Sequence, residues 1–422
     1  MPPTALASAG QRSHAGGADI WSFAPLATPS RGDPSASLPT RRLLFPRLPT
    51  NAAALTEDNR PSNILTSASQ CNAPPVPVLG PSDKPDVTLV TQASADRLWM
   101  VPHICGRWRD APMIVVSLSM PSARPDWRQT YGGSSCHLTR LQLSSNSDQG
   151  GEAAEAYPIN WMRNQGILCV KTTHYFVVDI DFWPSTELLT GIRLQLTSWG
   201  NSRRALVVPN FQRSGHGCRN DKKVTACRDA LEKGIIAMPT NFSELQACLT
   251  LNDCSVFDVE YNPQGQSSTN AKAWRAYEGY GSYRIPCIAS DRYEPFVLLH
   301  RTTETPLFDE RFQGYGKNKV QLTVHLRYAG FTFDVLARGF VIHFPHHKSA
   351  SKHKWLHSSA HSRVEHLFTK FEEELRTQYN DTSNRVPICR HGWEQKRKGG
   401  TEVKWERSFL VTNEFYGNHK IE

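Results

Sequence analysis

The chain has 422 residues, of which 39% are hydrophobic and 21% are charged, so it can bury a sizeable core and form one large or two small domains. Its formal net charge is +9 at pH 7, which is compatible with an anionic ligand. The basic residues are scattered and form no recognisable nucleic-acid module, so we expect no nucleic-acid partner.

The N-terminal segment differs in composition from the rest of the chain. Residues 1–84 are rich in Pro, Ser, Ala and Gly and show little periodic apolar patterning. Such a segment buries too little apolar surface to offset the entropy cost of ordering, so we predict that it is disordered and serves as a stem or a processed leader. We therefore place the main domain at residues 85–380 and a C-terminal extension at residues 381–422.

Strands and helices are predicted to alternate after this segment. Residues 87–91 have a strand pattern, and Ser94 is a candidate N-cap for a helical stripe over residues 97–105, in which Pro102 would produce a kink. The almost wholly apolar run 113–118 is typical of a strand that is buried on both faces of a parallel sheet.

The alternation continues further along the chain. Residues 160–170 predict a helix and residues 175–178 an apolar strand, while residues 331–336 and 339–342 have two more strand patterns. This order of elements predicts an α/β fold with a mainly parallel central sheet. Ligands of such sheets bind at the carboxyl ends of the strands, so we expect the chemistry there.

Two carboxylates, Asp179 and Asp181, directly follow the strand predicted at 175–178. Residues i and i+2 of a strand point the same way, so both side chains can converge on one cation, and a hard divalent ion such as Mg²⁺ or Mn²⁺ prefers oxygen ligands. An isolated pair of this kind is more often a solvated turn. The apolar strand before it and the segment 182–184 after it favour a metal site.

Histidines crowd the end of the strand predicted at 339–342. His343 directly follows this apolar run, whereas His346 and His347 come after Pro345, where the chain should leave the strand and become mobile. Fixing a mobile side chain costs entropy, so we predict that His343, and not the other two histidines, completes the metal site. A basic surface loop is the alternative.

Several stretches of the chain together resemble glycosyltransferase family 49. They are collinear and cover roughly residues 86–380. The matching stretches are 87–98, 157–164, 175–185, 205–211, 268–274, 293–301, 308–320 and 331–346. The resemblance implies a GT-A-type, nucleotide-sugar-binding fold. It also implies an inverting, metal-dependent transferase that takes glucuronic acid from UDP-glucuronate, with a glycan or glycoprotein as acceptor.

The resemblance also assigns residues to the cofactor and the donor. Asp179, Asp181 and His343 would hold Mn²⁺, with Mg²⁺ as the alternative. Thr91 and Gln92 would lie near the uridine. Arg163 and Asn164 occupy a Leu-Arg-Asn segment of the family in which Met162 replaces the leucine here, and Arg163 could equally form a structural ion pair.

The sequence leaves the catalytic base open. The segment 308–316 resembles one that is followed by acids in other inverting transferases, but residues 317–319 are Lys-Asn-Lys here. Asp309 and Glu310 are the nearest acids in sequence and Glu294 is a third candidate, although each could instead fix a loop through hydrogen bonds.

A glucuronate donor would also need a cation for its carboxylate, and Lys317, Lys319 and Arg275 are candidates. We considered three alternatives: a hydrolase that uses Asp179 and Asp181 as acid and base, a weak or inactive glycan-binding homologue, and a transferase for another UDP-sugar. Two acids at one strand end suit a shared metal better than the separated carboxylates of a glycosidase.

The cysteines and the glycosylation sequons give information about the cellular compartment of the protein. The ten cysteines include no CxxC pair, which argues against a structural zinc site and leaves disulfides or free thiols as alternatives. Asn241 and Asn380 begin sequons. The family implies a Golgi-lumenal type II membrane protein. No transmembrane or signal segment is visible, so membrane association would need a segment not visible in this chain.

Overall fold

The computed structural model describes residues 84–119, 136–145, 157–199, 203–277, 281–347 and 360–389, together with the short strand β1 (Ile64–Leu65). Apart from β1 and Lys84, the N-terminal segment that we predict to be disordered lies outside these residues, as does most of the predicted C-terminal extension. The domain boundaries therefore stay predictions.

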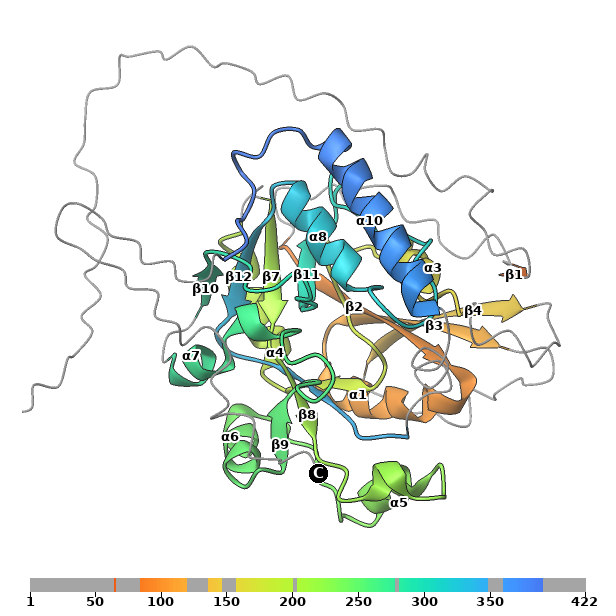
Figure 1. Cartoon of the computed structure of the whole chain (residues 1–422). Coiled ribbons are helices and arrows are strands. Elements are labelled where there is room, and N and C mark those ends of the chain that lie inside the picture. Colours follow the sequence, from red (N-terminus) through yellow and green to blue (C-terminus); the bar gives the residue numbers. More distant parts are fainter. Residues whose placement is uncertain are drawn as a thin grey trace, which may run out of the picture. The chain divides into compact units, whose positions relative to one another are not determined.

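Among the described residues, nine strands form a large sheet with the order β1-β4-β3-β2-β5-β11-β7-β12-β10 (Figure 1). Besides β1, its strands are β2 (Val87–Ser94), β3 (Pro112–Ser119), β4 (His137–Ser145), β5 (His174–Val177), β7 (Arg204–Val208), β10 (Ser282–Ile285), β11 (Phe296–His300) and β12 (Thr332–Leu336). The run β4-β3-β2-β5 is parallel, and so is the pair β7-β12, whereas β11 is antiparallel to both of its neighbours. The predicted α/β fold with a mainly parallel sheet is confirmed.

The chain passes three times from the large sheet into a smaller one. Its order is β6-β13-β8-β9, with β6 (Phe182–Pro184), β8 (Asn210–Arg213), β9 (Cys254–Val256) and β13 (Val341–His343). The strands β6, β8 and β13 directly follow β5, β7 and β12 along the chain. Gly339 lies between β12 and β13 and has a φ of 99°. A Cβ atom at this position would lie 2.7 Å from Leu188 Cα, so only glycine fits.

Helices cover the sheets. They are η2 (Ala95–Met100), α1 (Val101–Arg107), α3 (Ile159–Leu168), α4 (Leu188–Leu196), η3 (Cys218–Asn220), α5 (Ala226–Glu232), α6 (Phe242–Thr250), η4 (Ser267–Thr269), α7 (Ala271–Ala276), α8 (Val320–Tyr328) and α10 (Ala360–Gln378). The helix α3 packs on β2 and β3, and α8 lies beside α10 (Figure 1). The pair α8–α10 has its own apolar cluster, which is separate from the main core.

Most predicted elements are present, with two differences. The helical stripe after Ser94 divides into η2 and α1 one residue before Pro102, because a proline lacks the N–H group for a continuous ladder but fits the first turn of a helix. The strand β13 extends to His343, which therefore lies within the strand and not after it. The strand β4 was not predicted, since its sequence mixes polar and apolar residues evenly.

Disulfides connect the described cysteines. The bonds are Cys105–Cys136, Cys218–Cys227, Cys248–Cys254 and Cys287–Cys389, and Cys169 is also disulfide-bonded. Of the two alternatives for the cysteines, the structure favours disulfides. The last of the four bonds ties the beginning of the predicted C-terminal extension to the main domain.

No helix in the part of the chain that the structure describes is long and apolar enough to cross a membrane.

Candidate metal centre and donor site

Asp179 and Asp181 lie in a turn between β5 and β6, where the chain passes from the large sheet to the small one. A hydrogen bond from Phe182 N to Asp179 O (2.9 Å) closes this turn. The strand ends at Val177, so the alternation of side chains that we assumed for the two acids does not extend to them. As a result, the two carboxylates meet different partners.

Asp181, His343 and His346 bring three potential metal-ligand atoms within 4.8 Å of one another. Asp181 Oδ2 lies 2.9 Å from His346 Nε2 and 3.7 Å from His343 Nε2, and the two imidazole nitrogens lie 3.2 Å apart. The pairing of β6 with β13 sets His343 opposite Phe182, next to the turn that carries Asp181. Two of the three predicted metal ligands therefore lie together.

His346 joins this group against our expectation that the chain is mobile after Pro345. Beyond β13, Phe344 N donates a hydrogen bond to Asp181 O (2.7 Å), which holds the chain against the turn. His346 Nδ1 lies 2.6 Å from the carbonyl oxygen of His347. A carbonyl can only accept, so Nδ1 carries the proton, and in the neutral imidazole the lone pair of Nε2 faces the group. His347 itself lies outside the group.

A divalent transition-metal ion fits this donor set. Two imidazole nitrogens and a carboxylate oxygen lie close together, and one cation could bind all three. Mg²⁺ prefers oxygen ligands, whereas the nitrogen ligands favour Mn²⁺ or another transition metal. Burial lowers the pKa of His343 to about 4 despite the opposing effect of Asp181, so this imidazole is neutral near pH 7 and able to bind a metal.

Asp179 belongs to a second group of contacts, which feels the charge of Asp181. Its Oδ1 accepts hydrogen bonds from Arg163 (2.6 Å) and Gln92 (2.6 Å), and its Oδ2 lies 3.4 Å from Lys319 Nζ. Burial alone would raise the pKa of Asp179, but Arg163 and Lys319 together hold it below its ordinary value. Arg163 is 1% exposed, so the structure contains the buried ion pair that we considered for this arginine. The role of Asp179 as a metal ligand stays a prediction.

Thr91 and Gln92 are buried in β2, which continues beyond them to Ser94. Thr91 Oγ1 and Gln92 Oε1 are buried without a hydrogen-bond partner among the described residues. Buried polar atoms are rarely left unpaired, so these two mark a place where a ligand or water would be stabilising.

Asn164 fastens a loop that follows β11. Its side chain donates to Phe308 O (2.8 Å) and accepts from Phe308 N (3.0 Å), and it also donates to Glu310 Oε1 (2.7 Å). Asp309, the neighbouring candidate base, accepts hydrogen bonds from Arg311 on both oxygens. Both acids of this loop are therefore engaged in holding it.

Glu294 has a different environment. Burial raises the pKa of Glu294, Lys319 opposes this shift, and Asp258 and Asp179 add to it. Its Oε1 accepts a hydrogen bond from Asn262 Nδ2 (3.3 Å). Glu294 is electrostatically coupled to the Asp179–Lys319 pair. Sequence reasoning missed Asp258, which has no motif around it.

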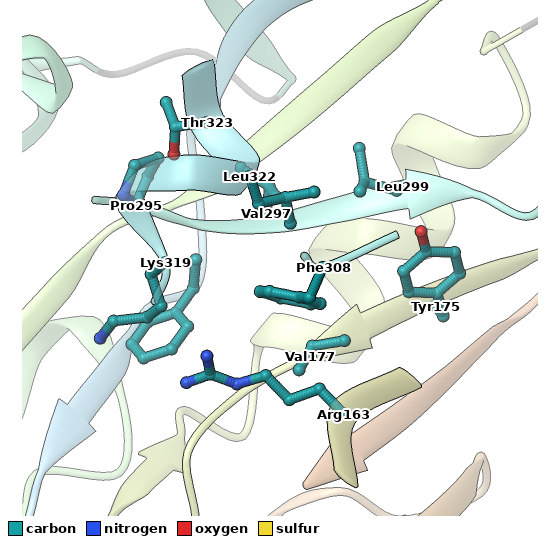
Figure 2. Close-up of a pocket in the computed structure, with 11 residues that line it drawn as sticks. Arg163, Tyr175, Val177, Pro295, Val297, Leu299, Phe308, Lys319, Leu322 and Thr323 are labelled. Atoms are coloured by element: carbon teal, nitrogen blue, oxygen red, sulfur yellow. The ribbon is translucent and has the colours of Figure 1, made fainter. Parts of the chain in front are cut away.

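Lys319 is enclosed by aromatic rings. Its ammonium lies 4.5 Å from the ring centroid of Phe296, 5.7 Å from that of Phe257 and 5.8 Å from that of Phe182. With Arg163 it forms the polar side of a small cavity of about 20 Å³ (Figure 2). That volume holds roughly one water molecule, so this cavity is too small for a donor.

The other two cations considered for a donor carboxylate point elsewhere. Lys317 Nζ lies 3.0 Å from Glu365 Oε2 and 4.0 Å from the ring centroid of Phe368, both on α10. Arg275 on α7 donates to Gln246 Oε1 on α6 (2.7 Å). Neither is brought to the Asp179 or the Asp181 group.

Arg97 is another site residue that sequence reasoning missed. It was expected only as part of a helical stripe. It extends from η2, and its NH1 donates to Asp181 Oδ2 (2.7 Å). Asp181 is 84 positions away along the chain, so no local pattern could reveal this contact.

The geometry and the comparisons with known proteins agree on the class of this chain. A family model described as glycosyl-transferase for dystroglycan matches residues 113–380, which is more than half of the chain. The chain belongs to this glycosyltransferase family, and the predicted resemblance to glycosyltransferase family 49 is confirmed.

Its relatives include larger proteins. The xylosyl- and glucuronyltransferase LARGE1 of Gallus gallus is 29% identical over 267 residues, which cover 63% of this chain and 32% of that protein. For LARGE2 of Rattus norvegicus the identity is 29% over 307 residues, covering 71% and 40%. The chain thus spans less than half the length of these curated relatives. The solved structure of S. aureus TarS with UDP has a TM-score of 0.35 at 10% identity and covers 61% of this chain and 60% of that chain.

Proposed function

We propose that this protein is an inverting, metal-dependent glycosyltransferase that moves glucuronic acid from UDP-glucuronate to a glycan or glycoprotein acceptor in the Golgi lumen. The observation that carries the metal dependence is the group formed by Asp181, His343 and His346 at the passage between the two sheets. The printed names of the relatives support the glucuronate donor. The disulfides support an oxidising compartment.

The residues of the proposed metal centre would be Asp181, His343 and His346, and Asp179 would support them from the second group. A bound divalent ion would supply positive charge against the leaving diphosphate. His346 is held for this role by its Nδ1–H bond to the His347 carbonyl, since the other ring nitrogen is then left bare. Thr91 and Gln92, with their unpaired oxygens, would face the nucleotide.

Glu294 is the base that the environment supports best. The acceptor hydroxyl would attack the anomeric carbon while the bond from that carbon to the diphosphate oxygen breaks, and Glu294 would take the hydroxyl proton. A raised pKa brings a carboxylate closer to the proton affinity that such a transfer needs. Lys319 opposes this rise in the pKa and so favours the ionised carboxylate, the form that can take a proton.

The decisive experiment combines a donor screen with metal binding. The full chain is incubated with acceptor glycans, Mn²⁺ and a panel of UDP- and GDP-sugars, and the released nucleoside diphosphate is measured. We expect release with UDP-glucuronate, and none in excess EDTA. Release of free sugar without an acceptor would favour a hydrolase, and no turnover with any donor would favour a glycan-binding homologue.

The ligand set is tested by substitution. His343→Ala and His346→Ala should each weaken Mn²⁺ binding and activity about 10–100-fold, by analogy with groups that surround other metal sites. His347→Ala is the matched control, because this imidazole contacts the backbone of Lys223 and not the group. If His346→Ala bound Mn²⁺ like the wild type, our assignment of His346 would be wrong and the sequence-based choice of His343 alone would stand.

The base is tested in the same assay. Glu294→Gln should lower kcat by roughly 10²–10⁴-fold with little change in Mn²⁺ binding. Asp309→Asn serves as the comparison, since Arg311 engages its carboxylate. A larger loss of kcat in Asp309→Asn than in Glu294→Gln would exclude Glu294 as the base.

A further inference from the structure

Arg97 occupies an unusual position beside the proposed metal centre. Its NH1 lies 2.7 Å from Asp181 Oδ2, the same oxygen that faces the ring nitrogens of His346 and His343. Its NH2 lies 3.3 Å from His346 Nδ1, but that nitrogen donates its proton to a carbonyl, so it cannot accept from a guanidinium. Among the residues that the structure describes, Asp181 Oδ2 is therefore the hydrogen-bond acceptor that holds the charged end of Arg97.

From this position we propose that Arg97 serves two partners in turn. It neutralises Asp181 when no metal is bound, and it moves to the diphosphate of the donor when the metal centre is loaded. This inference rests on the proposed function, since it concerns the same centre and the same donor. It adds a donor-binding residue and a coupling between metal and nucleotide.

The charges of the site support this exchange. A divalent ion held by Asp181 would stand next to the Arg97 guanidinium, and the single carboxylate charge would leave an excess of two positive charges. The diphosphate of a nucleotide sugar carries two negative charges, so it would balance that excess. Arg219 adds further positive charge near His343. In the neighbouring group, Arg163 and Lys319 already have the carboxylates of Asp179 and Glu294 beside them.

The surroundings of Arg97 allow the movement. Its side chain is 23% exposed, whereas that of Arg163 is 1% exposed. Arg163 also donates to Asn160 (2.8 Å) and Asn318 (3.2 Å), which hold it in place. Arg97 can therefore leave its carboxylate for another anion at the surface without stranding a buried charge, and Arg163 cannot.

We expect one substitution to change the affinities for Mn²⁺ and for UDP in opposite directions. Arg97→Gln removes a cation that competes for Asp181, so Mn²⁺ alone should bind several-fold more tightly, on the order of 3–10-fold from the loss of one neighbouring like charge. UDP should bind the Mn²⁺-loaded variant about tenfold or more weakly, because a charge-assisted contact to the diphosphate is lost. Both affinities are measured by titration calorimetry, with Mn²⁺ and UDP as the probes and no turnover required.

The coupling between the two ligands gives a further readout. In the wild-type protein Mn²⁺ should increase the affinity for UDP, and UDP the affinity for Mn²⁺, by the same factor, since such coupling is reciprocal. In Arg97→Gln this factor should shrink. Arg97→Lys should recover part of the UDP affinity, because the charge remains but the bidentate geometry is lost.

A matched control and two outcomes complete the test. Arg228→Gln removes a neighbouring guanidinium that lies over Trp99 and pairs with Glu232, and it should change neither affinity. If Arg97→Gln weakened both Mn²⁺ and UDP binding, or left UDP binding unchanged, the proposal would be overturned while the metal centre would stand. If the wild-type protein bound no Mn²⁺ with or without UDP, the proposed function itself would fail.

Discussion

The buried ion pair between Arg163 and Asp179 allows us to predict how much one substitution lowers the free energy of unfolding. Replacing Arg163 by methionine keeps the apolar stem but removes the guanidinium that donates to Asp179 Oδ1 at 2.6 Å. The carboxylate then keeps Lys319 at 3.4 Å and Gln92 at 2.6 Å as its partners. Because Arg163 is 1% exposed, water cannot take its place without a rearrangement.

Breaking a buried ion pair by removing one partner typically costs about 3–5 kcal/mol. The variant also loses the hydrogen bonds to Asn160 and Asn318, each worth roughly 1 kcal/mol. Lys319 and Gln92 stay beside Asp179 and offset part of this cost, so we expect Arg163→Met to lower the free energy of unfolding by about 3–5 kcal/mol, measured by urea denaturation with the disulfides intact. The double variant Arg163→Met/Asp179→Leu should recover part of this loss, since it removes the unpaired carboxylate and leaves Glu294 as the carboxylate next to Lys319.

Arg97→Met is the matched comparison. It breaks the ion pair with Asp181, whose arginine is 23% exposed, so solvent screens the charges and the cost should be about 1 kcal/mol or less. If Arg163→Met were no less stable than Arg97→Met, or if the double variant were less stable than Arg163→Met, the Arg163–Asp179 pair would not be a structural element of the fold.

Three further predictions use features away from the metal centre. Lys317→Gln should lower kcat/KM several-fold while changing stability by about 1 kcal/mol or less, because the lysine pairs with the partly exposed Glu365 on α10 and precedes Asn318 and Lys319, which contact Arg163 and Asp179; steady-state kinetics unchanged from wild type would contradict this. Burial, with a smaller effect of His300, lowers the pKa of His174 from 6.5 to about 3, so this residue stabilises the fold above pH 6.5 and its contribution decreases as the pH falls towards 3. His174→Phe should flatten the pH dependence of the unfolding free energy over that range, and an unchanged slope would count against it. Asn380 is exposed, whereas the side chain of Asn241 caps α6, so in a secretory host the mass of a glycan should disappear in Asn380→Gln and persist in Asn241→Gln.

Local patterns were sufficient to predict much of the fold. The strands β2, β3 and β5 and the helix α3 are each encoded by a few consecutive residues whose apolar periodicity does not depend on distant partners. The strand β4 was not predicted because its sequence mixes polar and apolar residues. Its strand conformation depends on parallel pairing with β3, which lies elsewhere in the chain. The two acids after β5 were recognised as a candidate metal motif for a similar reason, because they and the strand before them are close together in the sequence.

What these acids do was decided by tertiary structure. Strand alternation suggested that Asp179 and Asp181 converge, but the chain turns after Val177 and passes into a second sheet, so each acid meets its own partners. Proline at 345 suggested a mobile segment, yet a backbone hydrogen bond from Phe344 to Asp181 holds the following chain in place.

The sequence by itself therefore determined the fold class, the family and the short segments in which the chemistry lies. The selection of side chains within the site depended on contacts between segments far apart in the chain. Arg97 meets His346 over a separation of 249 residues, and Arg97 meets Asp181 over 84. Such contacts depend on where two sheets and their connecting turns come together, and no local periodicity carries that information because it describes only the neighbours along the chain.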